Sequence, residues 1–215
     1  MVPAALGLQT DWLPATEVRG EGIFLRLDED AVCRWEASDA VRAREEELRA
    51  GFLRWCEAVK EPPPFPGARF YLLHSLSHLL MTALSLECGY AASAIRERIY
   101  CSLPNDPVPM AGILLATGSS GTEGTLGGLV DQGRRLGAHL RAAWDAGSLC
   151  SNDPVCGHHS PQREQTGRLL EGAACHGCLF VAECACERFN QYLDRSLVVP
   201  SLGCDPAVAF FAERP

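Results

Sequence analysis

The 215-residue sequence carries no excess of positive charge and no apolar run long enough to cross a membrane. Its net charge is −8, and nucleic acids bind preferentially to basic surfaces, so strong autonomous DNA binding is not expected. The most apolar stretch, residues 70–86, is interrupted by His74 and His78 and is shorter than the roughly 20 residues of a membrane span. The N-terminus lacks the basic start and apolar centre of a signal peptide, so we expect a cytoplasmic protein.

Two catalytic motifs are also missing. The glycine-rich segment 117–128, TGSSGTEGTLGG, lacks the GK[ST] ending of a P-loop, which argues against an autonomous NTPase. This segment is open to two interpretations, an anion-binding loop before a helix or a close strand-to-helix connection. The sequence also lacks the HExxH motif of zinc hydrolases. These absences favour an interaction module over an enzyme.

What the sequence does have is cysteine, with eleven residues in all and six of them between residues 150 and 186. In a reducing compartment, clustered cysteines indicate metal ligands more often than disulfides. The spacing of Cys175 and Cys178 lets two thiolates reach one ion, and four thiolates suit tetrahedral Zn²⁺. We therefore predict a closed, structural zinc site that joins residues 149–156 to residues 175–190.

More cysteines are available than one tetrahedral ion needs. Our first choice of ligands is Cys156, Cys175, Cys178 and Cys186. Cys150 competes with Cys156 for one position, Cys184 is a weaker candidate, and three further candidate ligands are His158, His159 and His176. An iron–sulfur cluster or a redox-active CxxC would use the same residue types, although no thioredoxin-like pattern precedes the CxxC.

A second group of candidate residues lies outside the cysteine region. His74 and His78 are four residues apart, so on a helix they share one face. One interpretation is a metal-binding or acid–base pair, with Glu123 as a third member, as in a hydrolase or nuclease. The other is a pair of hydrogen-bonded histidines in the core. The charged residues 96–98, Arg-Glu-Arg, are interpreted as a solvated edge.

Hydrophobic periodicity predicts a mixed α/β or α+β fold, with a small sheet, packed helices and a C-terminal four-cysteine zinc knuckle. Residues 92–101 are ambiguous between strand and helix, and residues 186–199 are expected to form a short helix, with a strand as a further option. The remaining expected elements are a strand at 20–27, a helix within 31–60, a buried helix at 68–87, an inner strand at 111–116, a helix at 129–144 and a loose tail over the last dozen residues.

Six motifs occur in one order along the chain: LLHSLSHLLM, CGYAASAIRERIY, GILLATGSSGTEGTLGGLV, LCSNDPVC, GAACHGC and CERFNQYLDR. Together they resemble the zinc-binding (MZB) domain of MrfA-type helicases, in the form found in DrmB-like proteins of the DISARM anti-phage system. The resemblance covers roughly residues 10–200. It implies an N-terminal strand and helix at 1–67 that lead into the domain, the zinc-binding domain itself at 68–200 and a tail at 201–215.

The resemblance also implies a ligand set and a partner. The cysteines of the family correspond to Cys150, Cys156, Cys175, Cys178 and Cys186. Such domains accompany a superfamily 2 helicase, which carries the ATPase, and would reach DNA through that complex. DrmB-like chains are much longer, so this chain is expected to correspond to their C-terminal part. A plain oligomerisation scaffold is the remaining alternative.

Overall fold

The structure is a computed structural model that describes residues 20–91, 93–102, 106–117, 128–163 and 167–215. Its helices pack with a small sheet in a mixed α+β fold, and this confirms the predicted fold class. They are β1 (Gly22–Arg26), α1 (Glu29–Glu36), α2 (Asp39–Cys56), α3 (Gly67–Cys88), β2 (Ile95–Cys101), β3 (Ala111–Thr117), α4 (Leu129–Gln132), η1 (Gly133–Arg135), α5 (Leu136–Ser148), η2 (Arg195–Leu197) and η3 (Pro206–Val208).

The three strands form one antiparallel sheet in the order β1-β3-β2. The central strand β3 is the most apolar of them, as the prediction of an inner strand at 111–116 required, and Ile113 and Leu115 are buried. Ile113 is paired with Leu25 of β1 on one side and with Ile99 of β2 on the other. Within the ambiguous segment 92–101, residues Ile95–Cys101 form a strand, and its alternation between buried and exposed residues reflects a sheet with one covered face.

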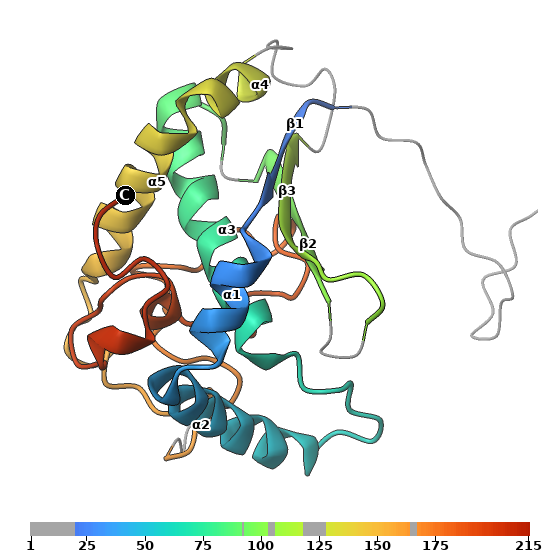
Figure 1. Ribbon diagram of the computed structural model, residues 1–215, viewed down its shortest axis with the longest axis vertical. Helices are drawn as coiled ribbons and strands as arrows, with labels where there is room; N and C mark the ends of the chain where they lie inside the picture. The colour runs from blue at the N-terminus through green and yellow to red at the C-terminus, as the bar shows by residue number, and fades with distance from the viewer. Residues whose placement is uncertain (1–19, 92, 103–105, 118–127, 164–166) are drawn as a thin grey trace, which may run out of the picture.

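Helix α3 runs through the middle of the molecule, with the sheet on one side and α5 on the other (Figure 1). It is apolar on nearly every face, and both of its neighbours bury it, so the predicted buried helix is confirmed. Gly89 ends the helix in the left-handed conformation, with φ of 69°, which glycine adopts without steric cost. None of the helices in the described ranges has the length and hydropathy needed to span a bilayer.

The helix expected within residues 31–60 is two helices, α1 and α2. The break lies at Ser38, whose side chain accepts a hydrogen bond from the amide of Val41 and so caps the start of α2. The predicted helix at 129–144 is likewise divided, into α4, a single 3-10 turn and α5. Residues 186–199 were expected to form a short helix or a strand, but they consist of turns and the three-residue η2.

Helix α5 approaches its neighbours closely at Gly147, where a Cβ atom would lie 2.9 Å from the terminal methyl groups of Leu79 and Val199. We expect Gly147→Ala to destabilise the protein by about 1–3 kcal/mol, because the surrounding core is already filled. Gly137 is exposed on the same helix, and Gly137→Ala should instead stabilise it by about 0.5–1 kcal/mol. Urea denaturation of both variants measures this contrast, and a Gly147→Ala variant as stable as the parent would contradict it.

The last residues do not form the loose tail that the sequence predicted. The indole nitrogen of Trp35 in α1 donates to the carbonyl of Val208 at 2.8 Å, and that of Trp144 in α5 donates to the carbonyl of Phe211 at 3.0 Å. Val208 is buried, and the Phe210 ring packs edge-on against Trp35. This segment is therefore part of the packed body, held by partners far away in the sequence.

Candidate metal centre

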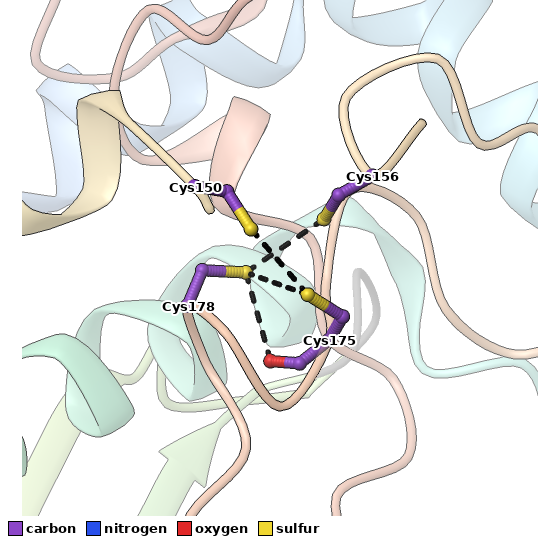
Figure 2. Close-up of side chains that lie close together, drawn as sticks. All are labelled: Cys150, Cys156, Cys175 and Cys178. Carbon is purple, nitrogen blue, oxygen red and sulfur yellow. Dashed lines mark hydrogen bonds between the residues drawn. The ribbon is translucent and has the colours of Figure 1, made fainter. Parts of the chain in front are cut away.

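Four cysteine side chains converge on one point at the end of α5 (Figure 2). Cys150 lies two residues after Ser148, the last residue of α5. Cys156 lies in the turn that follows, and Cys175 and Cys178 belong to a second turn. Their four Sγ atoms all lie within 4.8 Å of one another. Cys150 is thus placed by the chain that leaves the end of α5.

The sulfur–sulfur distances match a tetrahedral zinc site. Cys156 and Cys178 are 3.8 Å apart, Cys175 and Cys178 are 3.8 Å apart, and Cys150 and Cys175 are 3.4 Å apart. Sulfurs about 2.3 Å from one central ion at tetrahedral corners would be separated by about 3.8 Å. A disulfide needs about 2.05 Å, and all eleven cysteines are free thiols. The residues present therefore fit a closed zinc site.

Backbone amides point at two of the sulfurs. The amide of Asn152 donates to Cys150 Sγ at 3.4 Å, and that of Gly177 donates to Cys175 Sγ at 3.3 Å. Each bond favours the negatively charged thiolate, which is the form that binds metal. Gly177 is needed for a second reason: a Cβ atom there would be 2.6 Å from Ser151 Oγ in the facing turn.

A buried ion pair fixes the turn that carries Cys150. One carboxylate oxygen of Asp153 accepts from the amide of Cys150 at 3.0 Å. The other accepts from the amide of Gly157 at 3.1 Å and from Arg195 at 2.5 Å. Arg195 is fully buried and also donates to the carbonyl of Gly147 at 2.9 Å, so it ties the turn to the end of α5. This outer layer holds the cysteines in place without coordinating anything itself.

The same surroundings favour a thiolate at Cys156. The hydrogen bond from Cys178 and the nearby charge of Arg195 lower the pKa of Cys156. The same contact, together with burial, raises the pKa of Cys178. The thiolate is the form that binds metal, so these contacts favour that form at Cys156.

Comparison with known proteins bears directly on this centre. Residues 76–179 match the family model of the MrfA Zn-binding domain, and that range includes all four clustered cysteines. The chain contains an MZB domain. It is also homologous to the DISARM protein DrmB of Bacillus paralicheniformis, with 39% identity over 196 residues, which cover 89% of this chain. The chain spans 34% of that relative, about a third of its length.

Within the MZB domain, the structure groups Cys150 with Cys156, Cys175 and Cys178, whereas our first choice had Cys186 in place of Cys150. The reason is spatial: Cys186 Sγ lies 3.1 Å from His74 Nε2, in a different cluster. The other candidates point elsewhere. Cys184 and His176 are exposed, His158 contacts the carbonyl of Pro154, and His159 contacts that of Arg168.

A second cluster consists of His74, His78, Glu97 and Cys186, and all four are buried. Glu97 had been interpreted as part of a solvated edge, which the structure corrects. It lies on the same face of β2 as Ile95 and Ile99, so the two-residue alternation of a strand turns it inward. That alternation was the signal available in the sequence. Glu123, which we had proposed as the third member, lies outside the described residues.

Proposed function

We propose that this chain is a non-catalytic, zinc-stabilised accessory module that partners a superfamily 2 helicase in the cytoplasm and helps it engage DNA. The observation that carries the proposal is the four-sulfur centre. A tetrahedral ion held by four thiolates has no open position for water or substrate, so its role is to stabilise the fold. The homology to a DISARM protein supports a role in anti-phage defence, and DNA repair is the alternative setting.

The net charge of the chain supports a need for a partner in binding DNA. A net charge of −8 disfavours contact with DNA phosphates, so we infer that DNA is reached through the helicase. A hydrolase built on His74 and His78 has less support. Both side chains are fully buried, and their Nε2 atoms face Glu97 and not a cleft that a substrate could enter.

Co-purification tests the proposal. The zinc-loaded chain is co-expressed with the helicase encoded beside its gene, and complexes are separated by size-exclusion chromatography with light scattering. We expect a stable complex that Cys178→Ser abolishes, because the turn carrying it loses its metal. The matched control is Cys184→Ser, which changes an exposed cysteine of the same region and should leave the complex intact. A zinc-loaded chain that binds no helicase, or that only associates with itself, would contradict the proposal.

A further inference from the structure

The buried cluster of His74, His78, Glu97 and Cys186 brings together three separate parts of the chain. Both histidines come from α3, Glu97 comes from β2, and Cys186 lies in the turns that follow the cysteine centre. One ligand atom from each residue lies within 4.8 Å of the other three. The side chains of the two histidines and of Glu97 are completely inaccessible to solvent. Four chemically reactive groups therefore face one another in the core.

The contacts within the cluster converge on one carboxylate oxygen. Glu97 Oε1 lies 2.8 Å from His74 Nε2 and 3.2 Å from His78 Nε2. Cys186 Sγ lies 3.1 Å from His74 Nε2. Nitrogen, oxygen and sulfur ligands at tetrahedral corners of a zinc ion would be about 3.3–3.6 Å apart. At these three contacts the ligand atoms need to separate by about half an ångström or less to accept an ion.

The hydrogen bonds of the two outward-facing Nδ1 atoms determine whether the inward-facing Nε2 atoms carry a proton. His74 Nδ1 is 3.2 Å from the carbonyl of Tyr192, and His78 Nδ1 is 2.8 Å from the carbonyl of Leu179. A carbonyl oxygen only accepts, so each Nδ1 carries the proton. In the neutral ring, each Nε2 then presents a lone pair to the cluster. A backbone carbonyl that fixes the ring in this way is the usual outer partner of a metal-binding histidine.

The remaining two groups are arranged as anions. Cys186 Sγ accepts from the amides of Arg188 at 3.3 Å and Asn190 at 3.2 Å, which favours the thiolate. Glu97 accepts from the hydroxyl of Ser77 and from the amide of Glu187, the latter at 3.3 Å. Two lone-pair nitrogens, a carboxylate and a thiolate thus meet with no hydrogen of their own to share. A second proton on one ring would satisfy only one of the two nitrogens that face Glu97 Oε1, and satisfying both nitrogens would require both rings to gain one. Two imidazolium rings with centroids 4.6 Å apart would repel each other in the core.

We propose that His74, His78, Glu97 and Cys186 bind a second zinc ion, separate from the four-cysteine centre. Two imidazoles, a thiolate and a carboxylate form a donor set that zinc accepts in tetrahedral geometry, and one Zn²⁺ balances the charges of the two anions. With four protein ligands and no solvent access, the site is structural. It joins α3 to β2 and to the turns at 184–190. This inference does not depend on the proposed helicase partner.

Metal counting and X-ray absorption on the tag-free full chain, dialysed against zinc, test the inference. We expect about two zinc ions per chain, because the two clusters are separate ligand sets. Cys186→Ser and His78→Ala should each reduce the content to about one, by removing a ligand of the second ion. Cys178→Ser should also leave about one, by emptying the other centre. The matched control, Cys184→Ser, should keep both ions, since Cys184 belongs to neither cluster.

The X-ray absorption spectrum of the parent protein keeps the test decisive even where a variant fails to fold. Together, the two sites would surround zinc with five sulfur and three nitrogen or oxygen ligands. The four-cysteine centre alone would give sulfur ligands only. A parent protein that holds one zinc ion, surrounded by sulfur alone and lost in Cys178→Ser, overturns the second site and leaves the first one standing.

Discussion

Cys178→Ser should remove the zinc ion of the four-cysteine centre and lower the free energy of unfolding by about 5 kcal/mol or more. Structural zinc contributes about 10–16 kcal/mol of apparent binding free energy in isolated zinc-finger peptides. The effect here is smaller because α3 and the sheet keep a core of their own, whereas the two turns that carry the cysteines depend on the ion. Thermal unfolding followed by circular dichroism, together with metal analysis, measures both consequences.

Two controls separate zinc loss from a local effect of the substitution. Treating the parent protein with a strong chelator should destabilise it at least as much as Cys178→Ser does, because the chelator empties this centre and also the second proposed site. Cys184→Ser should retain the parent transition, since Cys184 is exposed and belongs to neither cluster. A Cys178→Ser protein with the parent melting temperature would show that this centre does not stabilise the fold.

Asp194→Asn should destabilise the protein by about 3–5 kcal/mol, because it breaks a buried network around one carboxylate. Asp194 is fully buried, and one of its oxygens accepts from Arg44 Nε at 2.8 Å. The other accepts from the amides of Ala173 and Ser196 and from the Ser196 hydroxyl. An asparagine can replace only one of these oxygens. Its amide group would face a donor, and the guanidinium of Arg44 would lose its counter-charge.

The pH dependence of stability provides a second measurement on Asp194. Burial opposes ionisation, but Arg44 and the hydrogen bonds from Ser196 hold the pKa of Asp194 below its ordinary value of 3.8. A lowered pKa means that the carboxylate contributes its full stability above about pH 4 and loses it as the pH falls further. The difference in stability between the parent and Asp194→Asn should therefore shrink in acid.

The matched control for this prediction is Asp145→Asn, at an exposed ion pair. Asp145 contacts Arg214 through both carboxylate oxygens, at 2.7 and 2.6 Å, but both side chains are about half exposed. Water screens such a pair, so we expect a much smaller change in the urea midpoint. Equal effects at Asp194 and Asp145 would show that burial does not set the strength of these interactions.

The elements of the fold were largely predictable because they depend on local pattern. The buried helix α3 and the inner strand β3 were recognised from apolar runs. The break at Ser38 was missed because the helical periodicity continues on both sides of it. The packing of Val208 against Trp35 was not predictable, since it joins residues that no local pattern relates.

The candidate site was predicted in part for the same reason. Cys175 and Cys178 could be recognised from their spacing, which is a local property. The choice between Cys150 and Cys186 depends on where α5 ends and on where His74 lies, and both are set by tertiary packing. Glu97 was missed because a charged residue between two arginines was given more weight than the alternation of the strand.

The hydrogen bond between Trp35 and Val208 spans 173 residues of sequence, and it has a consequence for how the molecule is made. During synthesis, α1 emerges before the segment around Val208, and its tryptophan stays uncovered until that segment has left the ribosome. Strand β1 likewise waits for β3, which is its only neighbour in the sheet as described. Contacts this distant slow folding and leave apolar surface exposed meanwhile. The packing around Trp35 is therefore completed only after the segment around Val208 has been translated.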